Sequence, residues 1–134
     1  MTTATYTAST VRPAPGCGTR ACPEAGCRWG FLVPPALRPR WTLILGDARD
    51  ELPPLLRRLG TIDVFFHDSD HRYAHMMWEY TTVWPHLAAG GLLISDDISF
   101  HTALWDFAAG VGAPVVIHRA NANVGAIVRR EGAC

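Results

Sequence analysis

The sequence has no excess of charge of either sign: twelve basic and twelve acidic side chains give a formal net charge of zero. Nucleic acids and anionic membranes require a basic surface, so neither partner is expected. No apolar run approaches the roughly 20 residues that span a bilayer. The first residues, MTTATYTASTVRPAPG, lack the apolar segment of a secretory signal. A cytoplasmic location is therefore expected.

Cysteine is also scarce, with four in 134 residues. Cys17, Cys22 and Cys27 are spaced five apart, whereas zinc ribbons and fingers use C-x-x-C pairs. A zinc site formed by all three is an alternative, but free thiols in a reducing compartment are the preferred interpretation. The sequence contains no internal repeat.

The composition changes near residue 40. Residues 1–40 hold most of the ten prolines and show neither strand nor helix periodicity, so they are predicted to be an irregular segment rich in Pro, Gly and Ala. Residues 41–134 are regular and form the predicted domain.

Apolar runs in the second region predict alternating strands and helices. Strands are predicted at residues 41–45, 62–67 and 92–95, helices at residues 50–59, 72–87 and 103–109, and a terminal hairpin at residues 114–118 and 124–129. The runs at 41–45 and 62–67 are expected to be buried strands. This order predicts an α/β sheet that is mostly parallel, with an antiparallel C-terminal hairpin.

Acidic residues follow two of the predicted strands. Asp68 comes after residues 62–67, and Asp96 and Asp97 come after residues 92–95. Successive parallel strands lie about 4.8 Å apart, and their carboxyl ends form the face where open α/β sheets bind ligands. The three carboxylates are therefore expected to meet and to hold Mg²⁺, Ca²⁺ or Mn²⁺ rather than zinc. As an alternative, any one of them could be a turn former or helix N-cap.

His71 lies three residues after Asp68, at the mouth of the same cleft. Because an imidazole titrates near neutrality, it suits removal of a proton from a substrate hydroxyl. The alternative is a capping or surface histidine. The other five histidines have no comparable partner in the sequence, and His67 is expected to point into the sheet.

The stretch IDVFFHDSDHRYAHMMWEY, followed by WPHLAAGGLLISDDI, resembles class I S-adenosylmethionine-dependent methyltransferases. The closest group is the metal-dependent small-molecule O-methyltransferases, both catechol O-methyltransferase-like and macrolide sugar methyltransferase-like. The resemblance covers about two thirds of the chain and implies a partial Rossmann-like sheet. It also implies that Asp68, Asp96 and Asp97 bind Mg²⁺ or another divalent cation, and that His71 is the general base.

The upstream segment LGDARDELPPL resembles the part of that family that borders the adenine of S-adenosylmethionine. The resemblance therefore implies that Asp47 and Ala48 contact the adenine, with Gly46 and Asp68 also in the cofactor site. The family's Gly-rich motif, E-x-G-x-x-x-G after a strand, is missing. Gly16-Cys17-Gly18 has the glycines but no apolar strand before it.

The implied function is S-adenosylmethionine-dependent O-methyl transfer to a small-molecule hydroxyl, by a truncated or rearranged chain that binds the cofactor weakly at best. Sheet edges left exposed by missing strands would permit homo-oligomerisation. Two alternatives stay open. One is a non-enzymatic methyltransferase-like remnant or binding module. The other is a metal-dependent glycosyltransferase that uses Asp68-Ser69-Asp70 as a D-x-D motif.

Overall fold

The computed structural model describes residues 33–130 of the chain. The chain divides into two compact units between Glu51 and Leu52, and each is described by itself. The predictions for the four cysteines, for Gly16-Cys17-Gly18 and for most of residues 1–40 concern residues outside the described range.

The described part of the first unit contains a short 3₁₀ helix, η1 (Arg38–Arg40), and the first turn of helix α1 (Ala48–Leu59). The predicted strand at Trp41–Leu45 is wrong, because these residues form no ladder with any described strand. A strand needs a neighbour that accepts and donates its backbone hydrogen bonds. An apolar run cannot show from its own sequence whether that neighbour exists.

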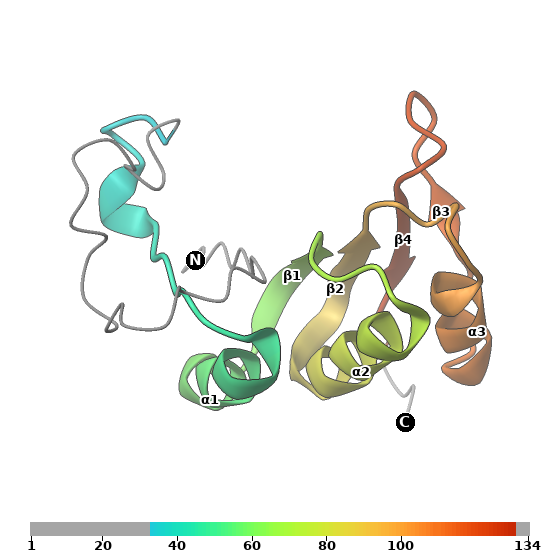
Figure 1. Ribbon diagram of the computed structural model, residues 1–134, viewed down its shortest axis with the longest axis horizontal. Coiled ribbons are helices and arrows are strands. Elements are labelled where there is room, and N and C mark those ends of the chain that lie inside the picture. The colour runs from blue at the N-terminus through green and yellow to red at the C-terminus, as the bar shows by residue number, and fades with distance from the viewer. Residues whose placement is uncertain (1–32, 131–134) are drawn as a thin grey trace. The chain divides into compact units, whose positions relative to one another are not determined.

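The second unit is built on a four-stranded mixed sheet. Its strands lie in the order β1 (Ile62–His67), β2 (Leu87–Ser95), β4 (Gly125–Val128) and β3 (Val116–Ile117). β1 and β2 are parallel, and β4 is antiparallel to both β2 and β3 (Figure 1). The predicted α/β class and its antiparallel C-terminal hairpin are confirmed, as is the side-by-side placement of the two strands that precede the acidic clusters.

Two helices cover one face of this sheet. Helix α2 (Tyr73–Val83) continues into the 3₁₀ turn η2 (Trp84–His86), and α3 (Ala103–Gly110) packs beside α2 (Figure 1). The core between the helices and the sheet contains Met76, Tyr80, Val83, Leu87, Leu93, Leu104, Phe107 and Ile127, all buried. Burial of this apolar surface is the main force that holds the unit together. Among the described residues, no helix is both long enough and apolar enough to cross a membrane.

Strand β1 is buried on one face only, contrary to the expectation of a fully buried strand. Phe65 and His67 are 5% and 1% exposed, whereas Val64 and Phe66 are 50% and 46% exposed. Alternate side chains of a strand point to opposite faces, and within the described residues the helices cover only one of them. β1 is also one of the two edge strands of the described sheet.

Gly91 sets the close approach of β1 and β2. A Cβ atom at this position would lie 2.8 Å from the carbonyl oxygen of Ala88 and 3.0 Å from that of Asp63. The register shifts between Ile62 and Val64 and is then continuous to the pair His67 and Ser95. The strands β1 and β2 therefore end side by side, and the loops that follow them begin next to one another.

Candidate active site

The loops after β1 and β2 begin next to one another. His67 and Ser95 are the last paired residues, and the backbone N–H of Asp96 still donates to the carbonyl oxygen of His67 at 3.0 Å. Asp68 follows His67 directly. Asp68 and Asp96 therefore emerge at the same sheet edge, as parallel strands with neighbouring carboxyl ends require.

His71 joins the two loops through its side chain. Its Nε2 atom lies 4.0 Å from Oδ1 of Asp68 and 3.7 Å from Oδ2 of Asp97. These distances are longer than hydrogen bonds, and Nε2 is buried with no hydrogen-bond partner among the described residues. An unpartnered buried polar atom costs free energy.

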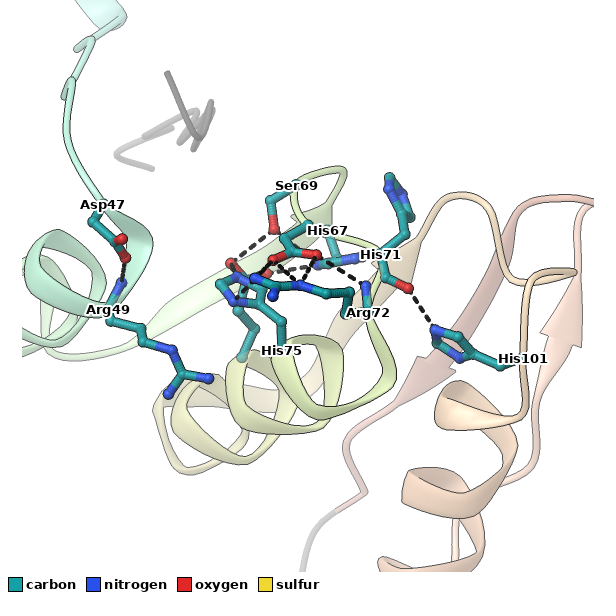
Figure 2. Close-up of polar contacts among 10 residues, drawn as sticks. Asp47, Arg49, His67, Ser69, His71, Arg72, His75 and His101 are labelled. Atoms are coloured by element: carbon teal, nitrogen blue, oxygen red, sulfur yellow. Dashed lines mark hydrogen bonds and ion pairs between the residues drawn. The ribbon is translucent and has the colours of Figure 1, made fainter. Parts of the chain in front are cut away.

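The backbone of His71 is held separately from its ring. Nε2 of His101, which precedes α3, donates to the carbonyl oxygen of His71 at 2.5 Å (Figure 2). The ring of His71 packs edge-on against that of His67, with 5.2 Å between the ring centroids. Contacts from the residue His101 before α3 and from His67 of β1 therefore hold the backbone and the ring of His71, respectively.

Asn123 holds the second acidic loop. Asp97 has a positive φ of 51°, which is uncommon for a residue other than glycine. The side-chain amide of Asn123 donates to Oδ1 of Asp97, and its backbone carbonyl accepts from the N–H of Ile98 at 3.1 Å. The sequence predicts Asn123 only as part of a hairpin turn. Its role at the site depends on the β3–β4 connection folding back over the end of β2.

A buried carboxylate, Glu79 on α2, lies under the first loop and is missing from the sequence-based predictions. Its side chain is 1% exposed and binds His67, Ser69 and His75. Burial alone would raise the pKa of Glu79, but hydrogen bonds from His67 and Ser69 and the charge of the histidines lower it below the usual value. The expectation that no histidine besides His71 has a comparable partner is wrong. His75 and Glu79 are four apart on a helix, which was the available signal.

Asp70 has a structural role at the start of α2. Its Oδ1 accepts from the backbone N–H of Arg72 at 3.0 Å, and both carboxylate oxygens accept from the guanidinium of that residue (Figure 2). These hydrogen bonds from Arg72 lower the pKa of Asp70 to about 2. Because Arg72 occupies this carboxylate, the Asp68-Ser69-Asp70 segment does not present the two free acids that a glycosyltransferase D-x-D motif needs.

The residues predicted to contact the cofactor adenine lie at the start of α1. Oδ1 of Asp47 accepts from the N–H of Arg49 at 2.8 Å (Figure 2). The carbonyl oxygen of Asp47 accepts from the N–H groups of Asp50 and Glu51. Asp47 therefore caps the helix, and Ala48 is its first residue. A Cβ on Gly46 would lie 2.6 Å from Cγ of Glu51, so a larger residue there would require the Glu51 side chain to move. The cofactor role of Gly46, Asp47 and Ala48 stays a prediction.

The predicted metal ligands fit a hard divalent cation by their chemistry. Asp68 and Asp97 flank one buried nitrogen, and carboxylate oxygens are the ligands that Mg²⁺ and Ca²⁺ prefer. In the range 33–130, however, no three His, Cys, Asp or Glu side chains are grouped closely enough to form a ready-made metal site. Ligation by Asp68, Asp96 and Asp97 therefore stays a prediction.

Fold and site together define an α/β domain in which a histidine lies near two aspartates at the carboxyl ends of two parallel strands. A family model described as a methyltransferase domain matches residues 4–98, more than half of the chain. The chain belongs to this methyltransferase-domain family. The match includes residues 4–40, and the predicted domain boundary at residue 40 stays untested.

Two curated relatives are O-methyltransferases by name. Mycinamicin VI 2''-O-methyltransferase of Micromonospora griseorubida is 33% identical over 73 residues, which are 53% of this chain and 18% of that protein. Demethylmacrocin O-methyltransferase of Streptomyces fradiae is 31% identical over 77 residues, which are 56% of this chain and 19% of that protein. The matched segment thus spans less than a fifth of each relative.

Solved structures support the fold. The MycE methyltransferase, in a complex with Mg, SAH and mycinamycin VI, aligns with a TM-score of 0.58 at 20% identity, over 72% of this chain and 34% of that one. CalS11, a TDP-rhamnose 3'-O-methyltransferase, aligns with a TM-score of 0.53 at 19% identity, over 69% of this chain and 42% of that one. Both confirm a methyltransferase-like α/β architecture.

Proposed function

We propose that this domain takes part in S-adenosylmethionine-dependent O-methylation of a sugar hydroxyl on a small molecule, with His71 as the general base. The observation that carries the proposal is the position of Nε2 of His71, buried and unpartnered among the described residues between Asp68 and Asp97. The sugar class is supported by two further relatives, whose names contain a rhamnosyl and an olivosyl group, and by CalS11, a TDP-rhamnose 3'-O-methyltransferase.

His71 would receive the proton of the substrate hydroxyl at Nε2 as the oxygen bonds to the methyl carbon of S-adenosylmethionine, whose methyl–sulfur bond breaks to leave S-adenosylhomocysteine. Proton transfer of this kind is worth about 10²- to 10⁴-fold in rate. Asp68, Asp96 and Asp97 would hold Mg²⁺ or another divalent cation. When bound, that cation would lower the pKa of the substrate hydroxyl and orient it. The two flanking carboxylates would also stabilise the imidazolium form of His71 after it takes the proton. Gly46, Asp47 and Ala48 would border the adenine.

The metal part of the proposal is tested by titrating the full chain with Mn²⁺ and following the free ion by electron paramagnetic resonance. Asp68→Asn is expected to weaken binding at least 10-fold. Asp63→Asn is the matched control, because Asp63 is an exposed acid on β1, the strand that precedes Asp68, and lies away from the carboxyl end of that strand. Equal Mn²⁺ affinity in the wild type and the Asp68→Asn variant would remove Asp68 from the ligand set.

The cofactor part is tested by thermal unfolding with S-adenosylmethionine. A ligand at 100 times its dissociation constant stabilises the folded state by about 2.7 kcal/mol, which is a clear shift in Tm for a small domain. A shift with S-adenosylmethionine but none with adenosine diphosphate would support methyl transfer. Mn²⁺ binding without any such shift would favour the methyltransferase-like remnant instead.

A further inference from the structure

The buried carboxylate of Glu79 contacts three segments that meet under the acid-bearing loop of residues 68–72. His67 is the last residue of β1, Ser69 lies within the loop, and His75 lies in the first turn of α2. We propose that Glu79 is a positioning residue that fixes this loop, and with it Asp68 and His71. The inference rests on the proposed roles of these two residues.

The geometry allows Glu79 to bind all three partners at once. Nδ1 of His67 donates to Oε2 at 2.6 Å, while the hydroxyl of Ser69 and Nε2 of His75 donate to Oε1 at 2.9 Å and 3.1 Å. Hydrogen bonds to an ionised acceptor are the stronger kind. One side chain therefore bridges the end of the strand, the loop and the helix, and the loop can move only if at least one of these bonds breaks.

The burial of Glu79 limits the conformations that the loop of residues 68–72 can adopt. Its side chain is 1% exposed and that of His67 is fully buried, so water cannot replace a lost partner. A buried carboxylate is tolerated only when its oxygens are satisfied. Alternative loop conformations that withdraw Ser69 or His67 would leave the buried carboxylate of Glu79 without one of its hydrogen bonds, and they are therefore disfavoured.

His67 transmits this constraint to His71. The His67 ring packs edge-on against both the His71 ring, at 5.2 Å, and the Tyr80 ring, at 5.5 Å. The hydrogen bond to Glu79 fixes Nδ1 as the donor and prevents the His67 ring from rotating. The ring of the proposed base, His71, thus packs against a histidine whose orientation is set by Glu79. In metal sites, a hydrogen-bond partner orients a ligating histidine in the same way.

The test compares Glu79→Gln with Tyr80→Phe in the full chain. Tyr80 is the matched control, because it is the adjacent residue on α2, is fully buried, and makes a hydrogen bond of 2.6 Å to Ser95 rather than to the loop. Phe at this position keeps the ring that contacts His67. Both variants remove a buried hydrogen bond, but only Glu79→Gln is expected to release residues 68–72.

We expect Glu79→Gln to lower the backbone ¹⁵N order parameters of residues 68–72 from about 0.85 towards 0.6, and Tyr80→Phe to leave them unchanged. The Mn²⁺ dissociation constant should rise about 10- to 100-fold in Glu79→Gln only. The low-field proton resonance of the short His67–Glu79 hydrogen bond should also be lost in that variant alone.

Each outcome decides a separate question. A rigid loop and wild-type Mn²⁺ affinity in Glu79→Gln, or equal changes in Tyr80→Phe, would overturn the positioning role. If the wild type binds no Mn²⁺, the proposed metal site fails, whereas a loss of loop order confined to Glu79→Gln would still support Glu79. Should Glu79→Gln fail to fold, Ser69→Ala removes one of the three bonds from a partly exposed position and is judged by the same measurements.

Discussion

Nε2 of His71 lies 3.7 Å from Oδ2 of Asp97, so a side chain from the loop after β1 faces an acid from the loop after β2. The two residues meet because β1 and β2 are parallel neighbours whose last paired residues, His67 and Ser95, end level with one another. The positive φ of Asp97 and the amide of Asn123 then direct the acid towards the histidine.

His71→Gln should abolish most methyl transfer without unfolding the domain. Loss of a general base costs about 10²- to 10⁴-fold in kcat, and the Nε2 atom of His71 has no hydrogen bond within residues 33–130 to lose. Single-turnover assays with a sugar acceptor would measure the rate, and Tm would report folding. His86→Gln is the control, since His86 binds the carbonyl of Gly60 away from the site. A His71→Gln rate within threefold of wild type would contradict the base assignment.

Asn123→Ala should weaken divalent-cation binding as well as stability. Asn123 binds Asp97, Ile98 and Ser99, and loss of its side chain removes the restraint on Asp97. We expect the Mn²⁺ dissociation constant to rise about 10-fold or more and the free energy of unfolding to fall by about 1–2 kcal/mol.

Asn121→Ala is the comparison for this prediction. Asn121 lies in the same turn, and its carboxamide oxygen accepts from the N–H of Asn123 without reaching Asp97. This variant should lose some stability and keep its Mn²⁺ affinity. If both variants lose affinity equally, the turn as a whole, rather than the Asn123–Asp97 contact, supports the site.

Gly91→Ala should destabilise the second unit by about 1–3 kcal/mol, the usual cost of forcing extra atoms into a packed region. The added Cβ would lie 2.8 Å and 3.0 Å from two backbone oxygens, which cannot move without disturbing the β1–β2 pair. Gly110→Ala is the control, because its Cβ would meet no atom within 4 Å. Urea unfolding would measure both. An unchanged midpoint in Gly91→Ala would show that the strands can separate at little cost.

The ion pair of Asp70 and Arg72 should contribute to the acid unfolding of the protein. The pKa of Asp70 is lowered from 3.8 to about 2, chiefly by hydrogen bonds from Arg72. A lowered folded-state pKa stabilises the fold above the unfolded value of 3.8, and this contribution is lost as the pH falls to about 2. Asp70→Asn and Arg72→Gln should both flatten the dependence of Tm on pH in this window. Wild-type slopes in both variants would contradict the assignment.

Several residues of the candidate site, and several elements of the fold, could be predicted from the sequence. Asp68, His71 and Asp97 follow apolar runs, and the rule that successive parallel strands are neighbours brings their ends together. The helices α2 and α3 and the terminal hairpin were also predicted, because their signals lie in local periodicity and turn residues. These features depend on residues close in sequence, or on a topological rule with few exceptions.

The remaining features depended on partners distant in sequence, and only the tertiary structure decided them. Whether residues 41–45 form a strand depends on a neighbour, and whether Val64 and Phe66 are covered depends on which layers pack on β1. Glu79 and Asn123 become important only because α2 and the β3–β4 turn pass close to the loops. The sequence by itself determined the order of the elements and the chemistry at their ends. The three-dimensional packing determined which side chains hold that chemistry in place, because hydrogen bonds between distant residues leave no periodic trace in the sequence.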